Sequence, residues 1–480
     1  MTETQKRLAM AGCLLTLVLA ILDQNIVSTA AWSIVSDLDP AHGIERLPWL
    51  VTAYALAATV ALPLYGKLCD VYGSKLVYMG AVALFLAGSV LCGVAGDMTW
   101  LIAARAVQGL GGGGLMSVTL VVFAHLVPAE QRASAGGAGG VMAGLGLVAG
   151  PLLGGLLADH FGWRWIFLAN LPLGLLVLLS ATTLRLSDGG LRHRIDYPGA
   201  AIFAAAASGL LLVTEWGGDE HAWTSPTILA LGAATLALAV AFVRREFTTA
   251  EPIVPLDLFR HPVMRITVPV QFLSSFAMIG SILFAIIYLR AARDVPAAES
   301  GLYLIPMAAG MALTGLISGR AIARGAAPRT FLLAGLGFST LAMILLGFLR
   351  QDTSLWLLDL DLALLGAGFG QVLGIIILLV QNSVPLNRLG VATTTIRFVQ
   401  TLGISLGSAV FGIILDRVTT AHLPPGLTPA QSPTAIVTGI NAVFFTAAAT
   451  MLAALALTAY GHAGRNPAPE ITETRSGGAE

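Results

Sequence analysis

Apolar blocks of about 20 residues recur along almost the whole chain, and they restrict the possible folds more than any other feature. A helix needs about this length to cross the hydrocarbon core of a bilayer. Because backbone groups in lipid must be hydrogen-bonded internally, the blocks predict membrane-spanning helices. Counting them between polar or Pro/Gly breaks gives about fourteen spans. Their approximate limits are residues 9–34, 47–66, 76–95, 99–125, 134–158, 163–184, 197–216, 226–243, 264–289, 299–318, 330–349, 355–380, 392–415 and 435–460.

The composition agrees with an all-α integral membrane protein. Apolar residues make up 56% of the chain and charged residues only 11%, whereas about a quarter of a soluble domain is charged. The net charge is zero and no basic run is present, so nucleic acid is excluded as a partner. Cys13, Cys69 and Cys92 are an odd number without paired ligand spacing. We therefore expect no disulfide framework, no metal site and no cofactor.

The positions of Lys and Arg test the number of spans, because these residues accumulate in cytoplasmic loops. With the N-terminus placed in the cytoplasm, most basic residues between the spans fall on the cytoplasmic side. The outer loops then hold only Arg46, Arg164, Arg290, Arg293, Arg350 and Arg417. We expect both termini to be cytoplasmic, with a disordered polar tail over residues 461–480. The first span continues past Asp23 without a cleavage site, so it is expected to be retained.

A weak internal repeat divides the chain into two related halves. The sequence VPAEQR precedes the fifth span and VPLNR precedes the thirteenth, each after a Gly-rich span. This register predicts a six-helix half over residues 1–190 and another over residues 263–460, with two inserted spans within residues 191–262. Paired halves of this kind suit alternating access around a site near the membrane midplane.

The segment GKLCDVYGSK connects the second and third spans and is placed in a cytoplasmic loop. It resembles the G-x-L-a-D-r-x-G-r-k signature of the major facilitator superfamily, through Gly66, Asp70 and Gly73. The resemblance implies the major facilitator fold. It also implies that Asp70 docks on the other half and holds the outward-facing state, against a helix that begins near Ala392 to Thr394. Two basic residues of the usual pattern are replaced here by Val and Ser.

The fifth span reads GLGLVAGPLLGG and is similar to the g-x-x-x-G-P-x-x-G-G element of antiporters in this superfamily. Small residues let helix backbones approach closely, and proline kinks the helix, which gives a flexible contact between the halves. A packing GxxxG pattern alone would not predict proline followed by two more glycines. The resemblance implies roles in gating for Gly146, Gly150, Pro151, Gly154 and Gly155.

Two charged residues inside spans carry the functional prediction. Asp23 lies in LDQNIV, similar to the L-D-x-T-V-x-N element of the fourteen-span drug:proton antiporter family, and the run WRWIFLANLPLG resembles the same family. Burial disfavours the charged carboxylate, so Asp23 is suited to load and release a proton. Arg105 fits the pattern l-x-x-x-R-x-x-q-G in the fourth span, where a buried guanidinium requires a carboxylate partner. The alternatives are a packing role for Asp23 and snorkelling of Arg105 to the outer interface.

Other polar residues within spans are weaker candidates. Asp359 and Asp361 cannot share a helix face, and we favour the deeper Asp361 for proton or substrate binding. Further polar candidates for a central cavity are Gln108, Asn170, Gln271, Gln371, Arg397 and Gln400, although helix-to-helix hydrogen bonding is more common for such residues.

These features predict a proton-coupled antiporter in a bacterial cytoplasmic membrane, monomeric, with a lipophilic or cationic small molecule, protons and the lipid bilayer as partners. In the expected cycle, Asp23 and Asp361 take protons from outside as the substrate leaves and lose them inside. One alternative keeps the fold and exports a lipid, siderophore, amino acid or endogenous metabolite. A membrane-embedded enzyme is the other, but the His residues are scattered at loops and helix ends, without a convergent cluster.

Overall fold

A computed structural model describes residues 3–40, 43–127, 153–158, 160–184, 196–218, 220–249, 252–254, 256–385, 388–424 and 432–461. Within them the chain is helical, and the only β pairing is an isolated bridge between Gly217 and His221. The helices are α1 (Glu3–Thr29), α2 (Ala31–Leu38), α3 (Gly43–Tyr72), α4 (Ser74–Gly93), α5 (Met98–Leu126), α7 (Arg164–Leu168), α8 (Asn170–Thr182), α9 (Tyr197–Trp216), α10 (Pro226–Thr248), α11 (Pro262–Arg293), α12 (Ala297–Ser300), α13 (Ile305–Ala323), α14 (Pro328–Leu346), α15 (Leu355–Ser383), α16 (Leu389–Ala421) and α17 (Pro433–Tyr460). Two short 3₁₀ turns are η1 (Leu256–Arg260) and η2 (Leu302–Leu304).

Within the described residues, 13 helical segments are long and apolar enough to cross a membrane. Each corresponds to one predicted span, and α7 and α8 together form the sixth. The predicted fifth span lies mainly outside the described residues, so the count of fourteen stays a prediction. A multi-pass, all-helical membrane architecture is nevertheless established.

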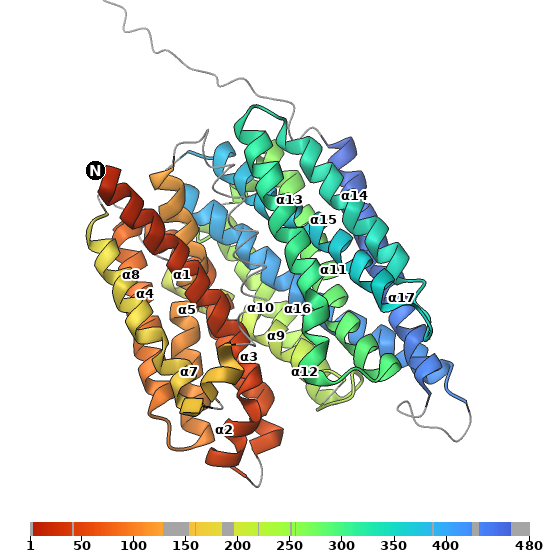
Figure 1. Ribbon diagram of the computed structural model, residues 1–480. Coiled ribbons are helices and arrows are strands. Elements are labelled where there is room, and N and C mark those ends of the chain that lie inside the picture. Colours follow the sequence, from red (N-terminus) through yellow and green to blue (C-terminus); the bar gives the residue numbers. More distant parts are fainter. Residues whose placement is uncertain are drawn as a thin grey trace, which may run out of the picture.

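The helices of the two sequence halves occupy opposite sides of the molecule (Figure 1). Helices α1 to α8 lie on one side and α11 to α15 with α17 on the other, while α9, α10 and α16 lie between them in this view. Helix α9 contacts both α3 and α16, so the inserted spans touch both sides of the bundle.

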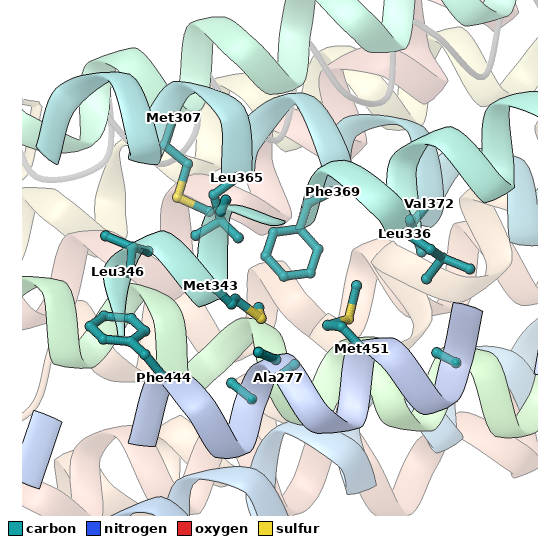
Figure 2. Packing of buried hydrophobic residues seen from close by; sticks show 14 of the residues in the cluster. Ala277, Met307, Leu336, Met343, Leu346, Leu365, Phe369, Val372, Phe444 and Met451 are labelled. Carbon is teal, nitrogen blue, oxygen red and sulfur yellow. The ribbon is translucent and has the colours of Figure 1, made fainter. Parts of the chain in front are cut away.

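Each side has its own apolar core. The largest cluster is built only from buried residues within 258–454 and includes Met307, Leu365, Phe369, Met343 and Met451 (Figure 2). Two other clusters use only residues 9–184. Among the described residues, the one cluster that joins the sides is small and comprises Val121, Ala124, Leu389 and Val384. Two separately packed apolar cores are what rigid-body rocking requires, although the predicted domain limits themselves stay a prediction.

Glycines set the close helix contacts in the same way on both sides. A Cβ at Gly113 of α5 would overlap the Ala58 carbonyl of α3, and one at Gly370 of α15 would overlap the Met311 carbonyl of α13. In each case the obstacle is backbone, which cannot rotate away. The repeated pattern explains why α5 and α15 are both Gly-rich. It also brings the neighbouring helices within reach of the polar side chains of α5 and α15.

We expect Gly366→Leu to prevent folding, because a Cβ at this position would overlap the Met307 carbonyl of α13. Gly337→Leu is the matched control, since nothing lies within 4 Å of a Cβ there. The three cysteines are free and buried, so a thiol-reactive dye reports unfolding directly. Equal melting temperatures for the two variants would contradict the packing described for α13 and α15.

The inserted spans are joined to each other at one end by an ion pair. Asp196 caps α9 by accepting a hydrogen bond from the Gly199 amide at 3.1 Å, and Arg245 of α10 donates to both carboxylate oxygens at 2.7–3.0 Å. Hydrogen bonding to Arg245 holds the pKa of Asp196 below its usual range. The charged pair therefore fixes the α9–α10 hairpin at neutral pH.

Candidate functional site

A buried ion pair connects α1 and α5. Arg105 donates from Nη1 to Oδ2 of Asp23 at 2.9 Å, and both side chains are at most 1% exposed. Arg105 lies about two turns inside α5, whose first residue is Met98. The snorkelling alternative is therefore wrong, because the guanidinium points into the bundle and is sealed from its surface.

Amide side chains complete the hydrogen bonding of the carboxylate. Gln108 donates from Nε2 to Oδ1 of Asp23 at 2.7 Å, and Asn170 donates from Nδ2 to the same oxygen at 2.9 Å. Both amides also donate to Ser89 Oγ, at 2.8 and 3.2 Å. Helices α1, α5 and α8 thus meet at one carboxylate, and Ser89 of α4 binds its two amide partners.

Arg105 Nη1 also donates to Gln108 Oε1 at 2.7 Å, and helix α3 contributes two further contacts of Arg105. Its Nε donates to the Leu50 carbonyl at 3.1 Å, and its guanidinium carbon lies 4.3 Å from the centre of the Tyr54 ring. A second ring, Phe167, lies 5.8 Å away. The charge of Arg105 is thus matched by a carboxylate, a carbonyl and two aromatic faces.

The backbone makes this convergence possible. A Cβ at Gly88 of α4 would overlap the backbone of Gln108 on α5, so only glycine lets the two helices approach this closely. Ser89 follows Gly88 and reaches both amides. We refer to Asp23, Arg105, Gln108, Asn170 and Ser89 as the Asp23 cluster. It holds an ionisable pair that a proton or a cation can disrupt.

The second side of the bundle contains no comparable cluster among the described residues. Gln271 donates to Ser275, Gln371 to the Ala367 carbonyl, and Arg397 to Gln400, each within its own helix. Of the six polar candidates for a central cavity, the structure thus brings Gln108 and Asn170 to Asp23. It does not bring the other four together.

Asp361 lies on α15 and is partly buried. It forms no hydrogen bond or ion pair with any described residue, and it is not joined to the Asp23 cluster. The neighbouring Asp359 has a buried Oδ1 without a hydrogen-bond partner. The role expected of Asp361 therefore stays a prediction.

The segment with Asp70 is helical, so its placement in a loop was wrong. Helix α3 continues to Tyr72 and α4 begins at Ser74, which leaves Gly73 as the single connecting residue. Its φ of 83° lies in the left-handed region, where glycine is favoured. The sequence reasoning ended the second span at the polar residues, but a helix can continue beyond the membrane surface.

Asp70 lies where α3 meets α16. A Cβ at Gly390 would be 2.8 Å from Asp70 Oδ1 and 2.7 Å from the Gly66 carbonyl oxygen. At Gly66, a Cβ would overlap Thr394 Oγ1. The structure thus places Gly66 and Asp70 against the first two turns of α16, close to the predicted Ala392 to Thr394. We call this contact the α3–α16 contact.

The residues expected to act in the fifth span are only partly described. Gly146, Gly150 and Pro151 lie outside the described residues. Gly154 is buried and Gly155 has nothing within 4 Å of an added Cβ. The gating role of this motif stays a prediction.

Ser89 was missed by sequence reasoning, because a single serine in an apolar helix gives no signal. An ion pair between Asp37 of α2 and Arg164, with an N···O distance of 2.6 Å, was also missed. Trp163 Nε1 donates to the same carboxylate at 3.0 Å. Hydrogen bonds from Arg164 and Trp163 hold the pKa of Asp37 below its usual range.

The comparisons with known proteins agree with this fold. The chain matches the Major Facilitator Superfamily over residues 13–195 and 197–408. It is 33% identical to the multidrug transporter protein MdtP of Bacillus subtilis, over 89% of this chain and 78% of that protein. It is 30% identical to multidrug resistance protein 3 of the same organism, over 88% of this chain and 82% of that one. An uncharacterized MFS-type transporter of Mycobacterium tuberculosis is 34% identical over 89% of this chain, but the chain spans only 63% of its length.

Solved structures share the arrangement of helices. The human organic anion transporter MFSD10 gives a TM-score of 0.68 at 16% identity, covering 95% of this chain and 100% of that one. The proton:xylose symporter XylE gives 0.65 at 16% identity, covering 94% and 96%. The family match and the shared fold point to a multi-pass membrane transporter. The chain belongs to the major facilitator superfamily.

Proposed function

We propose that the chain is a proton-coupled antiporter that exports lipophilic, often cationic, drugs or antibiotics by alternating access, as a fourteen-span drug:proton antiporter. The observation that carries this proposal is the buried Asp23–Arg105 pair, whose two side chains are at most 1% exposed within apolar helices. Relatives named as multidrug transporters and multidrug resistance proteins support the same class of cargo.

The chemistry follows from competition for one carboxylate. A proton on Asp23 removes the negative charge and leaves Arg105 as an unpaired buried cation. Breaking such a pair costs about 3–5 kcal/mol, so the Asp23 cluster is expected to rearrange when Asp23 is protonated. A lipophilic cation competes with the proton for the same carboxylate, which makes proton binding and substrate binding exclusive. The membrane potential supplies about 2.3 kcal/mol per charge for each 100 mV.

Helix α3 offers a path from the cluster to the α3–α16 contact. Leu50 and Tyr54 contact Arg105 near one end of this helix, and Gly66 and Asp70 contact α16 near the other. Leu50 and Asp70 are separated by about 30 Å along the helix axis. If α3 shifts when Arg105 loses its partner, the shift would therefore displace Gly66 and Asp70 at the contact between the halves. We propose this as the coupling element.

The α3–α16 contact lies at the end of the bundle that the positive residues assign to the cytoplasm. The structure is closed at this contact. In our proposal it therefore corresponds to the outward-facing state, in which Asp23 can take up a proton from outside. We further propose a bacterial cytoplasmic membrane, cytoplasmic termini, a monomer, and Asp361 as a second proton carrier.

The test is substrate-dependent collapse of the pH gradient in energised everted vesicles when ethidium is added. We expect a response with the native chain, none with Asp23→Asn, and partial recovery with Asp23→Glu. The thiol-reactive dye shows whether each variant is folded. A folded native protein that fails to respond to ethidium would reject cation export and favour a lipid or metabolite as cargo.

A further inference from the structure

Arg397 is a guanidinium within a spanning helix that has no carboxylate partner among the described residues. It lies about two turns inside α16, whose first residue is Leu389. Its Nη1 donates to Gln400 Oε1 at 2.8 Å, and its Nε is buried without an acceptor. An arginine at membrane depth is costly and is normally paired. Arg397 therefore carries a charge and donors that the described residues do not balance.

Arg105 shows what a balanced arginine looks like in the same bundle. It has a carboxylate on Nη1, a carbonyl on Nε and an aromatic ring beneath it, and it is 1% exposed. Arg397 has one neutral amide from its own helix and is only partly buried. The difference is one of partners, because both residues lie in apolar helices.

A carboxylate partner for Arg397 is also absent from the sequence of the span that the structure describes only in part. The predicted fifth span, residues 134–158, contains no Asp or Glu. On the other side of α16, Asp359 and Asp361 of α15 form no ion pair with any described residue. Among the described side chains, no carboxylate is therefore paired with Arg397.

The position of Arg397 on α16 places it between the halves. Thr394, one turn earlier, faces Gly66 of α3, while Gly403 faces α11. The next residue, Phe398, packs on Phe203 of α9, with ring centroids 4.8 Å apart. Helical spacing thus puts Arg397 beside the face directed at α3, whereas Phe398 points about 100° away around α16.

We propose that Arg397 binds an anionic group of the transported compound, a carboxylate or sulfonate, on the second-half wall of the transport path. The inference rests on the proposed function and narrows its substrates to include zwitterionic lipophiles. A planar guanidinium with a free Nε edge suits a carboxylate, which accepts two parallel hydrogen bonds. In this proposal Asp23 takes the cationic end of the same compound.

The test compares norfloxacin, which carries a carboxylate and a basic amine, with its methyl ester, which keeps the amine and loses the carboxylate. Binding to the purified full-length protein is followed by fluorescence. We expect Arg397→Gln to weaken binding of the acid at least about tenfold and to change binding of the ester by less than about twofold. Arg397→Lys should restore part of the affinity for the acid.

Equal weakening of the acid and the ester in folded Arg397→Gln would show a structural role and overturn the assignment. So would unchanged binding of the acid, or a native protein that binds the ester but not the acid. In that last case ethidium transport survives, so cation export stands without the anion site. If the native protein does not transport ethidium, the proposed function itself is rejected.

Discussion

Arg105→Met is expected to abolish transport and to destabilise the folded protein by about 3–5 kcal/mol. The substitution keeps an unbranched side chain of similar length but leaves Asp23 buried with a charge and only amide donors around it. The apparent melting temperature, followed by the exposure of the buried thiols, should fall sharply. Above all, the cost comes from the unpaired carboxylate rather than from lost packing.

Two controls separate this cause from others. The double variant Asp23→Asn/Arg105→Gln removes both charges. It should recover most of the stability but not transport, because two uncharged amides can hydrogen-bond to each other. Arg164→Met breaks an ion pair of similar length whose side chains are 41% and 48% exposed, so it should cost only about 1 kcal/mol. A double variant that is less stable than Arg105→Met would contradict the unpaired-charge explanation.

Gly390→Val is expected to open the α3–α16 contact and stop transport while leaving each half folded. The added Cβ would stand 2.7 Å from the Gly66 carbonyl oxygen and 2.8 Å from Asp70 Oδ1, so α3 and α16 must separate. Cys69 lies at the same contact, 3.2 Å from that Cβ, and is buried. With Cys13 and Cys92 replaced by Ala, alkylation of Cys69 should accelerate by about tenfold, which corresponds to a shift of about 1.4 kcal/mol.

Gly412→Val is the matched control on the same helix, since nothing lies within 4 Å of a Cβ there. Its alkylation rate and transport should equal those of the parent. If Cys69 in Gly390→Val reacts at the parent rate although transport is lost, the contact does not act as a gate.

The spans could be predicted from sequence because hydropathy over about 20 residues is a local property. Hydropathy could not predict where a helix ends once it has left the membrane. Helix α3 passes through the polar residues around Asp70 and stops only at Gly73, where a positive φ breaks it. Charge and polarity mark the membrane surface, whereas the backbone decides where the helix ends.

The candidate site was predicted unevenly for a physical reason. Asp23 and Arg105 stand out because a charge in an apolar block is costly and requires a partner. Gln108 and Gln271 look alike in sequence, yet one reaches Asp23 and the other binds Ser275 within its own helix. A neutral amide can make its hydrogen bonds within its own helix or to another helix. Only the packing of α4 on α5 at Gly88 therefore distinguishes Gln108 from Gln271.

The most direct test of the central claim, that Asp23 carries the exchanged proton, is the number of protons released when ethidium binds to the purified protein. Release is measured in weakly buffered solution from about pH 5 to about pH 8. The native protein should release protons when ethidium binds. Folded Asp23→Asn should release none across this range. Equal release by both proteins would contradict a role for Asp23 and assign the proton to another group.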